Sequence, residues 1–316
     1  MPGLTRSNYP DVLEPILAEV FVDDFTRHKS LIGEFCAVSK SKKAIETSSG
    51  RGAGRPMPVF TGSISYDTPS RRYKVTSEHI TFADGIMIEQ ELIEDNQYPE
   101  MFNLTKGLSD NAFLRKEAWY AKLFNLCTST AVDPDGFVTA GGDGVALASA
   151  AHPSNPDGTG PTQSNILSGA VGTTGLNATN LGTALTSAML FRDDRGNPTI
   201  SEFDTLLFPT ALWKEANIAL NTPQAPGGGD NDDNSVYHML KPYKYRYING
   251  DVGGSSTNWF LIDSAMAKRH VTWWDRTGMQ FQTTPDFDNF NMKVAVRKRW
   301  SLRSSDWRWI FAVIRT

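Results

Sequence analysis

The sequence predicts an α+β protein, because helical and strand patterns occur in an order that does not alternate regularly. A long helical pattern covers residues 98–130, and period-two alternation covers much of residues 44–91 and of the C-terminal 50 residues. The chain has 316 residues, of which 40% are hydrophobic and 21% are charged. This is enough apolar sequence for one large or two medium-sized domains.

The first 45 residues predict one amphipathic helix on an otherwise extended arm. Pro10 suits the first turn of this helix, where a missing amide proton costs no hydrogen bond. Apolar side chains recur at helical spacing, at Val12, Ile16, Val20, Phe21 and Phe25.

Residues 46–80 predict a long β-hairpin with an irregular tip. Glycine at positions 50, 52 and 54 and proline at 56 and 58 interrupt regular structure there. Residues 63–66 and 73–76 alternate as strands do. Alternation resumes over residues 80–91, in which Asp84-Gly85 is a candidate for a tight turn.

The longest predicted helix lies within residues 98–130 and would be roughly 45 Å long at about 1.5 Å per residue. Residues 130–176 are rich in turn-forming side chains and predict a long irregular segment. Further helices are expected at 177–191 and 210–220, the second capped by Thr210. Strands are expected at 203–208, 243–249, 259–263, 271–274, 279–283, 292–300 and 307–314.

Charged side chains are unevenly distributed. Residues 40–74 hold eight basic and two acidic side chains, whereas residues 75–100 hold seven acidic and no basic ones. Such neighbouring blocks predict complementary surfaces that meet within or between subunits, and two solvated faces without partners are the alternative. The candidate contact residues are Arg51, Arg55, Arg71, Arg72, Lys74, Glu89, Glu91, Glu94 and Asp95.

The sequence contains no motif that would support catalysis. Neither a phosphate-binding loop nor a Gly-x-Ser-x-Gly nucleophile motif occurs. His152 is expected to bond the backbone of its turn. The acidic run Asp230, Asp232 and Asn234 lacks the later glycine and glutamate of a calcium loop. We therefore expect no enzyme activity, no cofactor and no bound metal.

Two further features concern the compartment in which the chain folds. Cys36 and Cys127 are far apart and are expected to be buried free thiols. No apolar run reaches the 18 residues of a membrane span, and residues 1–11 do not form a signal peptide. We expect folding in the cytoplasm, without a membrane partner.

A basic strand near the C-terminus is a candidate for contact with nucleic acid. Its basic groups are Arg297, Lys298, Arg299 and Arg303, and tryptophans lie among them in an arrangement that can stack bases. The favoured alternative is a sheet with tryptophan on its packed face and basic groups in solvent. If the basic face lined a shell, contact with packaged DNA would be weak and independent of sequence.

Five loosely defined motifs follow one another along the chain, at residues 147–165, 194–198, 206–216, 231–234 and 259–263. The first begins Leu147-Ala-Ser-Ala-Ala-His152-Pro153, and the second is Asp194-x-Gly196-Asn-Pro198. In order and spacing they resemble the major capsid proteins of tailed bacteriophages with the Hong-Kong-97-type fold. Within that fold the chain is most similar to the Mu-type major head subunit group.

The resemblance implies a domain plan with four parts. These are an N-arm at 1–45, an extended loop at 46–80, a peripheral domain at 81–132 and 267–316 that contains a spine helix at 98–130, and an axial domain at 133–266.

The resemblance also implies a function. Copies of the chain would assemble into hexamers and pentamers of an icosahedral shell that encloses double-stranded DNA, forming a virion in the host cytoplasm. A separate scaffolding protein, a portal and a decoration protein are the other implied partners. An encapsulin-like cellular shell around cargo protein is the alternative, and a soluble enzyme with a site in residues 130–176 is a third possibility.

Overall fold

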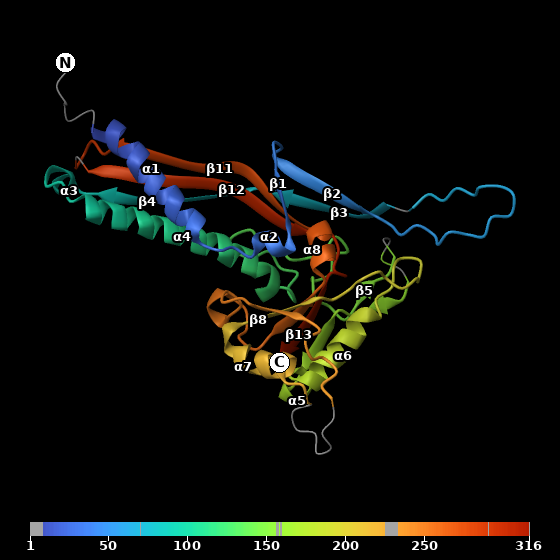
Figure 1. The fold of residues 1–316 in the computed structure, drawn as a ribbon. Helices are drawn as coiled ribbons and strands as arrows, with labels where there is room; N and C mark the ends of the chain where they lie inside the picture. Colours follow the sequence, from blue (N-terminus) through green and yellow to red (C-terminus); the bar gives the residue numbers. More distant parts are fainter. Residues whose placement is uncertain are drawn as a thin grey trace.

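The computed structural model describes residues 9–69, 71–155, 158, 160–224, 233–289 and 291–315, without the side chains of residues 9–12, 51, 171, 173 and 252. The molecule is elongated and contains two main sheets, with a hairpin that projects from one end (Figure 1). Helices and strands are mixed along the chain, which confirms the predicted α+β class.

The first sheet has four strands in the order β1-β11-β12-β4. Their bounds are β1 (Ala37–Lys40), β4 (Ile80–Ile88), β11 (Val271–Pro285) and β12 (Met292–Ser304). The candidate turn at Asp84-Gly85 is wrong, because β4 continues through both residues in register with β12. The two strands expected at 271–274 and 279–283 are likewise one strand, β11, which contains irregularities between Asp275 and Gln280.

Helices α1 (Tyr9–Arg27) and α4 (Tyr98–Asn125) pack on this sheet, with the short helices α2 (Ile32–Phe35) and α3 (Gln90–Glu94) beside them (Figure 1). α4 is the predicted long helix, with a proline in its first turn. The predicted N-terminal helix is confirmed as α1, and its Leu13, Leu17 and Phe21 are buried in a cluster with residues of α4 and β12. Of the apolar set expected from sequence, Phe21 is buried and Phe25 packs against the same cluster, whereas Ile16 is 41% exposed. Residues 12, 16 and 20 and residues 13, 17 and 21 both recur every four residues, so spacing alone does not tell which row packs against the sheet.

The second sheet has five strands in the order β7-β13-β10-β8-β9. They are β7 (Ile166–Gly169), β8 (Thr205–Phe208), β9 (Lys241–Lys244), β10 (Trp259–Ile262) and β13 (Ile310–Arg315). The resemblance implies that residues 267–316 belong to the peripheral domain, but β13 pairs with β10 and β7 in the second sheet. β13 is almost entirely buried, and a place beside β10 lets it bury both faces.

The remaining helices lie around the second sheet or between the two sheets (Figure 1). They are α5 (Val171–Thr174), α6 (Ala178–Met189), η2 (Thr210–Leu212), α7 (Trp213–Asn221), η3 (Gly250–Val252) and α8 (Ser264–His270). Asn177 caps α6 by accepting a hydrogen bond from the amide of Asn180. Thr210 is not the expected cap, because it lies inside a 3-10 turn that precedes α7.

The predicted hairpin is confirmed by strands β2 (Ile45–Arg51) and β3 (Arg71–Glu78), which pair antiparallel. Residues 63–66, expected as a strand, have no regular structure. Beyond the paired stem the two chain segments diverge and gain no ladder hydrogen bonds (Figure 1). A second, short pair, β5 (His152–Pro153) with β6 (Thr162–Gln163), lies near the hairpin root.

The chain crosses from the first sheet to the second at residues 305–309, and a buried carboxylate organises this crossing. Asp306 pairs with Arg72 of β3 and with Arg308, 3.1 Å away, and accepts hydrogen bonds from two backbone amides. Burial alone would raise the pKa of Asp306, but the guanidinium groups of Arg308 and Arg72 outweigh it and hold the pKa below 3.8. The hairpin is thereby held to the crossing.

Replacing Asp306 by Asn should destabilise the folded chain by about 3–5 kcal/mol at neutral pH, because two buried arginines lose their counter-ion. A carboxylate whose folded-state pKa is depressed contributes fully above its unfolded value of 3.8, and the contribution is lost as pH falls through the folded-state pKa. The difference in unfolding free energy between wild type and Asp306→Asn, measured with urea, should therefore shrink as the pH falls below 3.8. A difference that stays constant down to pH 2 would contradict this assignment.

A glycine beside the hairpin root supplies a second test. A β-carbon at Gly142 would lie 2.4 Å from the β-carbon of Tyr73 and 2.8 Å from a methyl group of Val75. Gly142→Ala should therefore lower the melting temperature, since overpacking costs about 1–3 kcal/mol. Gly107→Ala is the matched control, because Gly107 lies in α4 with open space around it. It should stabilise the chain by about 1 kcal/mol.

Candidate intersubunit surfaces

The hairpin tip, residues 52–69, extends away from the rest of the molecule (Figure 1). Its large apolar side chains are exposed instead of packed, and they are Met57, Val59, Phe60, Ile64 and Tyr66. Met57 is 96% exposed and Tyr66 is 90% exposed. Clustered exposed apolar groups on a soluble protein mark a surface that another molecule covers.

The base of the tip is tethered to a turn of the same chain. Asp67 pairs with Arg195 at 2.9 Å, and the amide of Ala53 donates to Asp194 at 2.8 Å. The backbone amide of Arg55, followed by Arg195, lowers the pKa of Asp67 below its ordinary value. The tether fixes where the tip leaves the molecule and leaves residues 56–64 without a comparable anchor among the described contacts.

The basic residues proposed from sequence have different environments. Arg71 and Lys74 on β3 are exposed, whereas Arg72 forms an ion pair with Asp306 inside the same chain. Arg55 is exposed and donates to the carbonyl of Ser65 at 2.9 Å, bracing the tip. The side chain of Arg51 lies outside the described atoms.

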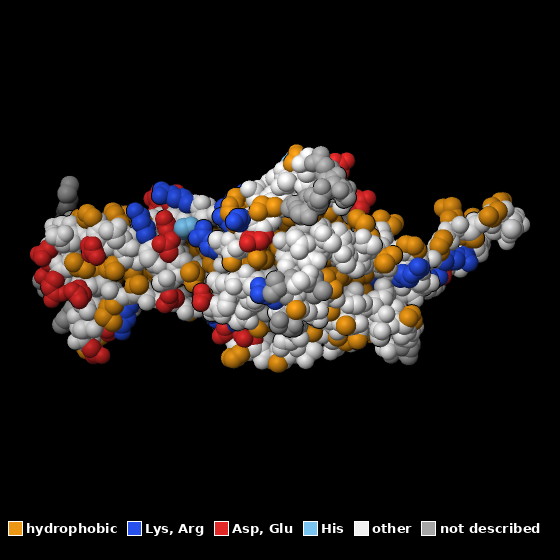
Figure 2. Space-filling model, turned by 90° about the horizontal axis from the view of Figure 1, so that it is seen from below, with side chains coloured by type: hydrophobic (Ala, Val, Ile, Leu, Met, Phe, Trp, Pro, Cys, Tyr) orange, Lys and Arg blue, Asp and Glu red, His pale blue; other side chains and the backbone are white. Residues whose placement is uncertain are grey.

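The acidic residues proposed from sequence lie together at the other end of the molecule. Glu89, Glu91, Glu94 and Asp95 are all exposed, in or beside α3. Figure 2 shows acidic groups at that end and basic groups along the hairpin stem at the opposite end. The two sets therefore cannot meet within one copy of the chain.

The proposed DNA-contacting residues lie on two faces of β12. Arg297 is exposed, and Arg299 shares its face and donates to the carbonyl of His79 at 3.4 Å. Lys298 lies on the opposite face, where it pairs with Asp275 at 3.2 Å. Arg303 donates to the carbonyls of Thr76, Val138 and Ala140.

The interpretation of these tryptophans as a base-stacking surface is wrong, because their side chains are buried. Trp300, Trp307 and Trp309 are each at most 3% exposed. Tryptophan on the packed face was the favoured interpretation, and the apolar core around β12 and β13 accounts for it.

His152 is fully buried and does not bond the backbone of its turn as expected. Its ring nitrogens lie 2.7 Å from Asp143 and 3.1 Å from the side-chain oxygen of Asn165, and its ring stacks on Trp307. Tertiary contacts thus replace the local ones, and they join Asp143 and Asn165 through His152 to Trp307 at the sheet crossing. Asp230 and Asp232 lie outside the described residues.

Two other side-chain groups bear on the expected absence of chemistry. Cys36 and Cys127 are buried free thiols as predicted, and burial raises the pKa of each to about 12. His28 lies 2.9 Å from Asp110 and 3.8 Å from Asp24, and these polar contacts link the end of α1 to α4. Among the described helices, none is long and apolar enough to cross a membrane.

Three solved structures with this fold are distant from this chain in sequence. The capsid of an empty GTA particle superposes with a TM-score of 0.57 at 13% identity and covers 90% of both chains. A virus-like particle from Pyrococcus furiosus gives 0.55 at 8% identity over 96% of this chain and 99% of the other. The capsid of Myoviridae phage XM1 gives 0.51 at 14% identity over 90% and 91%. These likenesses confirm the fold.

Comparison with curated protein sequences found no match. A family profile described as phage capsid protein matches residues 73–313, which is most of the chain. The match begins within the hairpin stem and covers the long helix, the sheet crossing, and the strands of both sheets except β1 and the end of β13. The chain is therefore a member of the phage capsid protein family.

Proposed function

We propose that this capsid protein assembles into the hexamers and pentamers of an icosahedral shell that encloses double-stranded DNA. The observation that supports this most directly is the projecting hairpin, whose exposed apolar tip gains burial only against another molecule. The domain plan is part of the proposal, with the hairpin as extended loop, α4 as spine helix, and β13 moved from the peripheral domain to the sheet of the axial domain. Assignment to the Mu-type group stays a prediction.

The opposite charges at the two ends of the molecule support a head-to-tail contact. Arg71 and Lys74 lie on the hairpin stem, and Glu91 and Asp95 lie at the α3 end. A surface that meets a different surface on the next copy generates rings when the rotation closes. Each exposed ion pair is worth about 0–1 kcal/mol, so repetition around a ring is needed for strength.

The remaining partners follow from the function and not from a particular contact. A scaffolding protein, a portal and a decoration protein would assist assembly in the host cytoplasm, and the product would be the virion. Arg297, on the uncovered face of the first sheet, is the side chain among the four proposed that is best placed for non-specific contact with DNA.

Electron microscopy of the purified recombinant chain tests the proposal. Closed shells with local sixfold and fivefold clusters are expected, and nucleic acid inside particles isolated from an infected host would match the phage function. An encapsulin-like shell predicts cargo protein in place of DNA. A chain that stays monomeric at every concentration and salt condition would overturn the proposal.

Charge reversal tests the head-to-tail contact. Arg71→Glu combined with Lys74→Glu should reduce particle yield several-fold at low salt and leave the melting temperature of the unassembled chain unchanged, since both side chains are exposed. Adding Glu91→Lys and Asp95→Lys should restore part of the yield. Arg72→Glu is the matched control, because it should lower the melting temperature by disrupting the Asp306 pair. Unchanged yield in the double reversal argues against the contact.

A further inference from the structure

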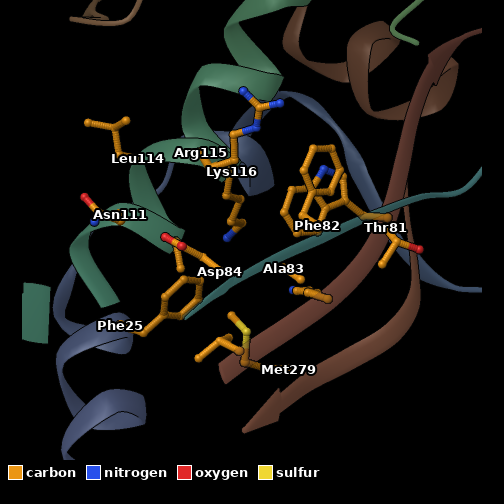
Figure 3. Close-up of a pocket in the computed structure, with 14 residues that line it drawn as sticks. Phe25, Thr81, Phe82, Ala83, Asp84, Asn111, Leu114, Arg115, Lys116 and Met279 are labelled. Carbon is orange, nitrogen blue, oxygen red and sulfur yellow. The ribbon is translucent and has the colours of Figure 1, made fainter. Parts of the chain in front are cut away.

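A cavity of about 500 Å³ lies between α1, α4 and the first sheet. Its walls are partly aromatic, with Phe25 from α1, Phe82 from β4 and Trp300 from β12. Figure 3 shows the side chain of Lys116 entering this space from α4, with Asp84 on the side of β4. Its volume is within the range of pockets that bind a ligand or an anchoring side chain.

Three basic side chains line the cavity, and within the described residues two of them form ion pairs and Lys116 does not. Arg115 pairs with Asp135 at 3.0 Å, and Lys298 pairs with Asp275 at 3.2 Å. Lys116 forms no ion pair within the described residues, and its ammonium lies 5.6 Å from the ring centre of Phe25. Burial, followed by the charge of Lys298, lowers the pKa of Lys116. An anion beside an aromatic group would complement such a wall.

That combination occurs on this chain, at the turn that joins β11 to β12. The turn reads Asp286-Phe287-Asp288, and Phe287 is 93% exposed. Asp286 is engaged with Lys293 at 2.7 Å, whereas Asp288 forms no ion pair with any residue that the structure describes. The turn therefore offers an aromatic ring next to a carboxylate that has no cationic partner among the described residues.

The turn cannot reach the cavity of its own copy. β11 and β12 stay paired as far as Pro285 and Met292, and the amide of Asp286 donates to the carbonyl of Asn291 at 2.7 Å. The cavity begins near Val296, four residues back from Met292 along the ribbon, or about 13 Å at 3.3 Å per residue. A paired ribbon does not fold back over that distance, so another copy must supply the turn.

We propose that the turn at residues 286–288 of one copy inserts Phe287 into this cavity of a second copy, where Asp288 pairs with Lys116. The hairpin tip also exposes aromatic rings, but it carries Arg55, and its acidic residue Asp67 is engaged with Arg195. Charge complementarity therefore favours the 286–288 turn. This contact rests on the proposed shell function and adds a second contact between copies to the one made by the hairpin.

A charge-swap experiment on the full chain tests the contact, with particle yield measured by sedimentation and electron microscopy. Phe287→Ala should reduce yield about tenfold, and Asp288→Lys and Lys116→Glu should each reduce it. The double variant Asp288→Lys with Lys116→Glu should recover at least half of the wild-type yield. Asp251→Lys is the matched control, since it makes the same charge change at an exposed residue of η3. Failure of the double variant to recover, with each chain shown folded by circular dichroism, would overturn the pairing.

Cross-linking separates this contact from the shell function itself. Asp288→Cys and Asn111→Cys, purified as separate chains and co-assembled under oxidising conditions, should give a disulfide-linked dimer on a non-reducing gel. The native cysteines are buried and should not contribute. Shells that form without the cross-linked dimer would refute the contact and leave the proposed function standing. If wild-type chains form no shells at all, the proposed function fails first.

Discussion

The buried carboxylate of Asp306 is the interaction on which the arrangement of the molecule depends. It binds Arg72 of the hairpin and Arg308 of the sheet crossing. Arg308 in turn donates to the carbonyl of Arg192 at 2.9 Å, next to the turn whose Asp194 and Arg195 hold the base of the hairpin tip. One chain of polar contacts therefore orients the hairpin relative to both sheets, because breaking a buried pair costs far more than breaking an exposed one.

This anchoring explains why the hairpin projects. Its root is held by buried charge and by close packing at Gly142, and the base of its tip is tethered to Asp194 and Arg195. Residues 56–64 beyond that tether expose their large apolar side chains. The long axis of the subunit then separates the basic stem from the acidic end (Figure 2). A rigid subunit whose complementary surfaces lie far apart satisfies them only against other copies, which is the geometry that a closed shell requires.

Much of the fold was predictable because its elements have strong local signals. The hairpin, α4 and the strands of the C-terminal region follow from period-two and helical patterns and from glycine and proline positions. The errors occurred where local patterns are degenerate. In α1, residues 12, 16 and 20 and residues 13, 17 and 21 both recur every four residues, so spacing does not tell which row is buried. Asp84-Gly85 suits a tight turn, but it also fits within a strand when β12 provides a partner.

The sequence by itself determined the fold class, the family and the existence of separate basic and acidic blocks, since these depend on composition, periodicity and motif order. Tertiary structure alone decided which charges remain available. Arg72 and Asp306 are 234 residues apart, and no local pattern pairs them. Lys298 and Arg297 are neighbours in sequence but lie on opposite faces of β12, because successive side chains of a strand point in opposite directions. Which of these groups faces solvent depends on which helices cover the sheet, and that depends on packing across the whole chain.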